Sequence, residues 1–179
     1  MARTRHIKKT TLIIVAEGAH DKAFLDHMKS LYDHRDSGQK VTINSADGGS
    51  PHDVIKTAIK KTSHAAYDQK YIFMDSDVAI KQQDLSLAKK NNIIVLLSEP
   101  LCLEGMLLDI LGQRIPENSE LCKRALHPQL AGQPTEAKSY MVLFPHAVLN
   151  ATEKQAVVEL RTLLINEMKK IKKHEDNSS

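Results

Sequence analysis

Hydrophobic positions along the chain fall into short, mainly apolar runs that alternate with longer stretches of helical spacing. The short runs cover residues 11–16, 41–45, 71–74 and 93–97. Runs of this kind, bounded by polar and turn residues, are typical of buried strands. Helical spacing follows the first run at these positions: Phe24, Leu25, Met28, Leu31 and Tyr32.

Further helices are indicated by their start signals and apolar stripes. Ser50 as a cap, Pro51 at the first helical position and Asp53 three residues after the cap predict a helix after the second run. A helix is also expected through Leu85 and Ala88, before the fourth run. The last third is predicted to hold helices over 103–111 and 118–130 and a long final helix. That helix would start at a capping box of Thr152 and Gln155 and carry a stripe of Val157, Leu160, Leu164, Met168 and Ile171.

Alternation of strands and helices predicts an α/β fold with a parallel sheet of about four strands, flanked by helices on both faces. A strand order of 2-1-3-4 would make the first and third strands neighbours. We expect a basic arm over residues 1–10 and a single domain over 11–179 that includes a helical C-terminal extension. In such sheets the ligand site lies beyond the carboxyl ends of the strands, where strand order reverses.

Acidic residues lie at that edge, after three of the four predicted strands. Glu17 and Asp21 follow the first run, Asp75 and Asp77 follow the third, and Glu104 follows the fourth. Carboxylates gathered at one point resist ionising together unless a hard cation such as Mg²⁺ or Mn²⁺ lies between them. The sequence therefore predicts a divalent-metal site.

Composition narrows the class of protein. With 179 residues, 41% hydrophobic and 26% charged, the chain suits one domain of ordinary size. Its apolar runs are far shorter than the roughly 18 residues of a membrane helix, and the segment MARTRHIKK lacks the apolar core of a signal peptide. We therefore expect a cytoplasmic protein. Cys102 and Cys122 are expected to be small buried hydrophobic residues.

Positive charge gathers near both ends of the chain, although the net charge is only +3. The basic residues are Arg3, Arg5, Lys8 and Lys9 at the start and Lys169, Lys170, Lys172 and Lys173 at the end. Such runs can contact the phosphates of a nucleic acid, and they can equally be solvated.

The acidic segments resemble the Toprim domain of topoisomerases, bacterial primases, and OLD-type and RloB-like nucleases. The resemblance rests on Glu17, Gly18 and Asp21 after one apolar run and on Asp75-Ser-Asp77 after another. The segment from Ser98 to Glu104 resembles the RloB-like and OLD branch most closely, although Glu99-Pro100 and Leu103 stand where that branch often has Asn-Pro and Phe. The resemblance covers roughly residues 11–111.

This resemblance implies roles for the matched residues. Glu17 would bind metal or transfer a proton, and Asp21, Asp75, Asp77 and Glu104 would hold one or two Mg²⁺ or Mn²⁺ ions, with Ser98 completing the centre. Gly18 would let the backbone approach a phosphate. Lys138 would correspond to a late lysine that meets transition-state charge in OLD-type nucleases.

The function expected from the resemblance is metal-dependent cleavage of nucleic-acid phosphodiester bonds, in a setting of bacterial defence against phage. OLD proteins carry an ATPase in the same chain, whereas this chain has no G-x-x-x-x-G-K-[ST] loop, so we expect a separately encoded ATPase partner. DNA or RNA, and a monomer or a homo-oligomer, remain open at this point.

Two other functions fit part of the sequence. Asp75-Ser-Asp77 also resembles the nucleophile motif of haloacid-dehalogenase phosphatases, but that motif usually follows the first strand and normally ends in Thr or Val, where Ala79 stands here. The chain could also be a non-catalytic module that binds metal and nucleic acid for a partner enzyme.

Two further motifs carry weaker expectations. Amides of Gly48 and Gly49, in the turn before Ser50, could touch a phosphate or simply form a tight turn and cap. His20, His27 and His34 recur every seven residues on one helix face, and about two turns is too far for a shared metal. We expect these histidines to form a solvated stripe.

Overall fold

A computed structural model describes residues 9–166, which contain one four-stranded parallel sheet. Its strands are β1 (Thr10–Ala16), β2 (Gln39–Ser45), β3 (Gln69–Asp75) and β4 (Ile93–Ser98). The strand order is β2-β1-β3-β4, as predicted, and every pair is parallel. The carboxyl ends of the two central strands, β1 and β3, therefore lie next to each other.

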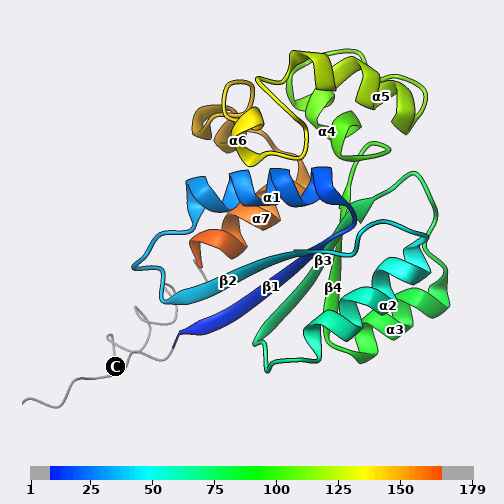
Figure 1. Ribbon diagram of the computed structural model, residues 1–179, viewed down its shortest axis with the longest axis vertical. Helices are drawn as coiled ribbons and strands as arrows, with labels where there is room; N and C mark the ends of the chain where they lie inside the picture. Colours follow the sequence, from blue (N-terminus) through cyan, green and yellow to red (C-terminus); the bar gives the residue numbers. More distant parts are fainter. Residues whose placement is uncertain (1–8, 167–179) are drawn as a thin grey trace, which may run out of the picture.

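Helices cover both faces of this sheet, which confirms the predicted α/β architecture (Figure 1). Ile13 and Val15 face α2 (Pro51–Thr62) and α3 (Gln82–Lys90) in one buried cluster. Leu12 and Ile14 belong to a second cluster with α1 (Ala19–Tyr32) and α7 (Gln155–Ile165). Because successive side chains of a strand point to opposite faces, the apolar run of β1 can serve both clusters.

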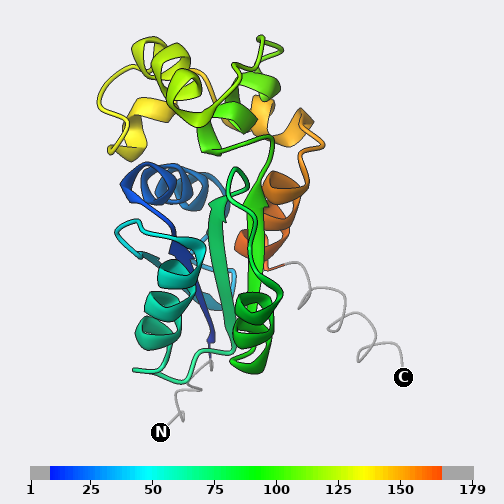
Figure 2. The same cartoon turned by 90° about the vertical axis from the view of Figure 1, so that its right-hand side faces the viewer.

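A group of shorter helices lies beyond the carboxyl ends of the strands (Figure 2). It consists of α4 (Leu103–Ile110), α5 (Ser119–Leu126) and α6 (His146–Ala151), with 3₁₀ turns η1 at His127–Gln129 and η2 at Ala137–Tyr140. The predicted helix over 118–130 is thus α5 followed by η1. This group of helices brings side chains from distant parts of the sequence to the edge where the acids were predicted.

The ends of the helices match the sequence in one case and differ in another. Ser50 and Asp53 form the predicted capping box of α2, since the Asp53 amide donates to Ser50 Oγ and the Ser50 amide donates to Asp53 Oδ2. The predicted capping box of the final helix is wrong. α7 begins at Gln155 after Lys154, and Thr152 instead ends α6.

The last described helix is also shorter than predicted. α7 ends at Ile165, because Asn166 adopts the left-handed conformation with φ of 60°. Met168 and Ile171, the end of the predicted stripe, lie outside the described residues, as do residues 1–8 of the basic arm and the terminal lysines. Within residues 9–166, no helix is long and apolar enough to cross a membrane.

Candidate metal centre

Glu17 and Asp75 meet at the carboxyl edge of the sheet, as the strand order predicted. Glu17 directly follows β1, and Asp75 is the last residue of β3. The Glu17 carboxylate accepts a hydrogen bond from the Asp75 backbone amide at 2.9 Å. This bond ties the side chain of one strand end to the backbone of the next, so the two acids are held at one point.

The Asp75 side chain is fixed from the neighbouring strand and from α4. Its Oδ1 accepts hydrogen bonds from the Ser98 hydroxyl and the Leu103 amide, both at 3.0 Å. Burial and the charge of Glu17 nevertheless raise the pKa of Asp75 to about 6. Ser98, predicted as a metal ligand, is fully buried and donates to Asp75, so the structure gives it a positioning role for that carboxylate.

Asp21 lies in the first turn of α1, and only one of its two oxygens has a partner. Oδ2 accepts from the Gly18 amide at 3.1 Å, whereas Oδ1 is buried and has no hydrogen bond among the described residues. Burial, followed by the charges of Asp75 and Glu104, raises the pKa of Asp21 well above its ordinary value. A buried carboxylate oxygen without a partner, amid other acids, is the environment that a bound cation would satisfy.

Asp77 lies at the exposed side of the same group. Its carboxylate accepts from the Ser119 hydroxyl of α5 at 2.5 Å. Burial raises the pKa of Glu17, and the charge of Asp77 raises it further. The name acidic cluster is used below for Glu17, Asp21, Asp75, Asp77 and Glu104.

Glu104 is the most firmly held acid of the acidic cluster. Its Oε1 receives hydrogen bonds from His20 Nδ1 at 3.1 Å and from His127 Nε2 at 2.8 Å. Burial disfavours the charged form, but these two hydrogen bonds outweigh it and hold the pKa of Glu104 at about 2. Glu104 is therefore a carboxylate at neutral pH, although its side chain is only 3% exposed.

A lysine from α5 balances part of the negative charge. Burial works against the charge of Lys123, yet the carboxylates of Glu104 and Asp75 raise its pKa. Lys138, the predicted lysine, instead lies in η2 with a 77% exposed side chain and pairs with Glu136 at 3.2 Å. Lys123 rather than Lys138 is thus the lysine that interacts with the acidic cluster.

The glycines predicted to touch a phosphate are placed near this edge, but two of their amides are already used. The Gly18 amide donates to Asp21, and the Gly48 amide donates to the Glu17 carbonyl at 2.8 Å. Gly48 and Gly49 both have positive φ, which favours glycine in the turn after β2. For Gly18 and Gly48 the structure therefore supports an internal structural role.

Sequence reasoning missed three residues of this region and misplaced a histidine. His20 and His127 bind Glu104, and Lys123 adds positive charge. The predicted solvated histidine stripe is wrong, because His27 is 1% exposed and bonds the Phe144 carbonyl through Nε2 at 2.7 Å. Of the three missed residues, only His20 could have been found from the sequence, because it lies between Glu17 and Asp21.

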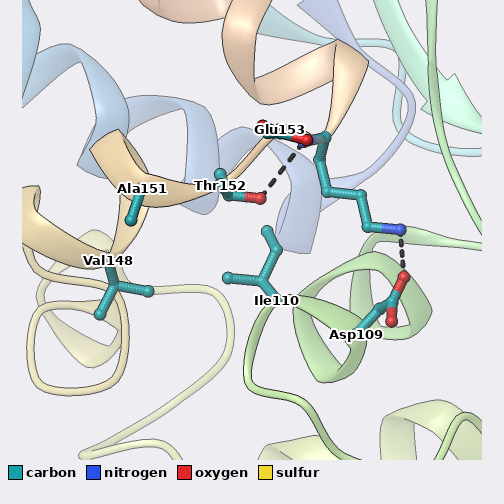
Figure 3. A pocket seen from close by; sticks show the side chains of 7 residues that line it. Asp109, Ile110, Val148, Ala151, Thr152 and Glu153 are labelled. Atoms are coloured by element: carbon teal, nitrogen blue, oxygen red, sulfur yellow. Dashed lines mark hydrogen bonds and ion pairs between the residues drawn. The ribbon is translucent and has the colours of Figure 1, made fainter.

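A hollow in the described part of the chain lies away from the acidic cluster. It has a volume of about 500 Å³ and lies between α4 and the segment from α6 to α7 (Figure 3). Lys154 forms an ion pair with Asp109 at its wall. None of its lining residues belongs to the acidic cluster, so that cluster is a site at the sheet edge rather than in this hollow.

Comparisons with known proteins add no family to this picture. The chain matches no protein-family model, no curated protein and no solved structure. The proposed function therefore rests on the geometry of the acidic cluster and of the two histidines that bond Glu104. That geometry fits a bound cation, because Asp21 Oδ1 has no partner and three carboxyl groups have raised pKa values.

Proposed function

We propose that the protein is a metal-dependent nuclease that cleaves nucleic-acid phosphodiester bonds at the acidic cluster with Mg²⁺ or Mn²⁺. The main support is that Asp21 Oδ1 is buried and has no partner among the described residues. Burial and the charges of neighbouring acids also raise the pKa of Asp21. Carboxylates grouped at the carboxyl edge of a parallel sheet provide the oxygen ligands that these cations prefer.

Four residues at the proposed centre have surroundings that suit a particular role. Asp75 and Asp21 would be ligands, since Ser98 and Gly18 orient them. A divalent cation held there would polarise the phosphate and lower the pKa of the attacking water. Glu17, whose pKa is already raised by burial, would accept the proton of that water, and Lys123 would face the charge of the phosphate.

The resemblance to RloB-like and OLD-type nucleases supports the choice of nucleic acid as substrate. It also supports a role in bacterial defence against phage with a separately encoded ATPase. Glu17 and Asp75 are held in position for their proposed roles, because Glu17 accepts from the end of β3 and Asp75 accepts from the first residue of α4.

The decisive experiment replaces one ligand without changing its shape. Asp75→Asn should lower Mg²⁺- or Mn²⁺-dependent cleavage of DNA or RNA by about 100-fold or more, because a negative ligand is lost while an acceptor for Ser98 and Leu103 stays. Glu17→Gln should have a similar effect. Cleavage is measured on single- and double-stranded substrates with Mg²⁺, Mn²⁺ or EDTA, beside a small phosphomonoester.

Asp26→Asn is the matched control, since Asp26 is a partly exposed acid of α1 that pairs with Lys22 and lies outside the acidic cluster. It should cleave like the wild type. A folded Asp75→Asn variant with wild-type cleavage would contradict the catalytic assignment and favour a binding module. Turnover of the phosphomonoester alone would favour the phosphatase.

A further inference from the structure

We propose that His20, Glu104 and His127 form a second metal site, which binds a transition-metal ion such as Zn²⁺, Co²⁺ or Mn²⁺ in preference to Mg²⁺. The proposal goes beyond the nuclease assignment, because it concerns ligands that are not all oxygen and holds whether or not the acidic cluster cleaves nucleic acid. These three residues are called the histidine–glutamate group below.

The three side chains come from separate elements and meet at one carboxylate oxygen. His20 lies in the first turn of α1, Glu104 in the first turn of α4, and His127 at the start of η1. One ligand atom from each lies within 4.8 Å of the others, and the two imidazole rings stand at 90° with centroids 4.8 Å apart. Two ligand atoms of one ion with bonds of about 2.0 to 2.2 Å lie at most about 4.4 Å apart, so the three side chains would have to move inward to hold an ion.

A second observation points to a cation beside this group. The Asp21 side chain follows His20 in the first turn of α1, is 6% exposed, and has a buried oxygen without a partner. A cation bound beside the first turn of α1 would give this oxygen a partner.

The imidazoles can change from donors to ligands when the two nitrogens that face Glu104 lose their protons, either to the opposite ring nitrogen or to solvent. In the absence of metal, Nδ1 of His20 and Nε2 of His127 each lie within hydrogen-bond distance of Glu104 Oε1, so each of these two nitrogens carries a proton. A metal would take the lone pairs of those nitrogens once these protons have left. Solvent can accept from the opposite ring nitrogens, since the side chains are 32% and 24% exposed.

The ligand types decide the metal. Two histidines and one carboxylate are the set found in catalytic zinc sites and in open-sided iron sites, whereas Mg²⁺ prefers oxygen ligands and keeps its waters. The sheet-edge acids Glu17, Asp75 and Asp77 offer only oxygen. The two neighbouring sites should therefore differ in preference, with Mg²⁺ at the acids and a transition metal at the histidine–glutamate group.

The test measures metal binding by the full chain without a polyhistidine tag. Zn²⁺ affinity is determined by calorimetry or a competing dye, and Co²⁺ binding is followed by its visible absorption bands. His20→Ala and His127→Ala should each lower Zn²⁺ affinity by at least about 10-fold, the lower end of the loss seen for residues that only support a ligand. Mg²⁺ affinity should stay unchanged in both variants.

His52→Ala is the matched control, because His52 also bonds a buried carboxylate, that of Asp84, but has no second histidine beside it. It should bind Zn²⁺ like the wild type. Wild-type Zn²⁺ affinity in both His20→Ala and His127→Ala, or an equal loss in His52→Ala, would overturn the proposal. Asp75→Asn should keep the Co²⁺ spectrum even when it loses nuclease activity, so failure of the nuclease assignment and failure of this site are separate results.

Discussion

The acids of the acidic cluster differ in how their charge is compensated. Glu104 receives two imidazole hydrogen bonds, and its pKa falls to about 2. Asp75 receives bonds from a hydroxyl and an amide, but burial and the charge of Glu17 still raise its pKa to about 6. Asp21 has an oxygen with no described partner. The two imidazole hydrogen bonds thus favour the charged form of Glu104, whereas burial and neighbouring charges favour the neutral forms of Asp75 and Asp21.

This difference predicts how stability changes with pH in the absence of metal. Asp75 has a folded pKa of about 6 against an ordinary 3.8, so the fold favours its neutral form. The free energy of unfolding should therefore fall as pH rises from about 4 to about 6, by roughly 2 to 3 kcal/mol at most. Urea unfolding in EDTA across this range measures the slope, and Asp75→Asn should flatten it.

Mg²⁺ should reverse this loss above pH 6, because it binds the native state. Glu104 changes stability in a lower pH range, because its pKa of about 2 in the folded protein lies below its ordinary 4.5. Its contribution to the free energy of unfolding is lost as pH falls from about 4.5 to about 2. An equal slope in Asp75→Asn and Asp26→Asn would show that another group causes the change.

The elements themselves were largely predictable, because their signals are local. Apolar runs marked all four strands, and the alternating sides of β1 explain why no polar residue interrupts it. The strand order 2-1-3-4, which we considered from the sequence, is the observed order and places Glu17 beside Asp75. The capping box at Thr152 was wrong because the same residues can end one helix as well as begin another.

The rest of the site could not be predicted, because it depends on how the helices beyond the sheet pack. His127 lies 23 residues after Glu104, and no periodic pattern relates the two. Lys123 and Ser119 of α5 reach the acids only because α5 packs against α4. Nothing in the residues around Gly18 or Gly48 shows whether their amides are free or bonded within the chain.

Close packing of α4 leads to a prediction at Gly105. A Cβ at this position would lie 2.3 Å from the Pro100 carbonyl oxygen, which is a backbone atom that cannot easily move. Gly105→Ala should lower the free energy of unfolding by about 1 to 3 kcal/mol, although alanine is the better helix former. Metal binding should weaken as well, since Leu103 and Glu104 precede the clash.

Gly18→Ala is the control on the opposite side of the site. Its φ of −132° suits any residue, and the nearest atom to an added Cβ is Asp21 Oδ2 at 3.5 Å, an ordinary contact. Denaturant unfolding should show little change for this variant. Equal stability of Gly105→Ala and the wild type would mean that α4 can move away from Pro100 without loss.

At the scale of the whole molecule, charge is divided between the sheet edge and the ends of the chain. The acidic cluster repels a nucleic acid unless cations are bound, while Arg3, Arg5, Lys8 and Lys9 precede β1, which starts at the opposite edge of the sheet. The proposed nuclease function needs attraction for the phosphate backbone outside the acidic cluster. The basic arm can supply it, because residues 1–9 contain four lysines and arginines and no acid.

Deleting residues 1–9 should therefore reduce both the affinity for nucleic acid and its dependence on salt. Each phosphate contact releases about 0.9 counterion from duplex DNA, so losing up to four basic residues should make the slope of log affinity against log salt shallower by up to about 3 to 4. Fluorescence anisotropy with the folded Asp75→Asn variant, which should not cleave the probe, measures the slope with and without the arm. Replacing Lys56 and Lys60 of α2 by Gln removes two lysines far from the arm in sequence and serves as the control. A slope that the deletion leaves unchanged would show that the arm is only solvated and that the nucleic acid is held by other residues, of which Lys123 beside the acidic cluster would be the first to replace.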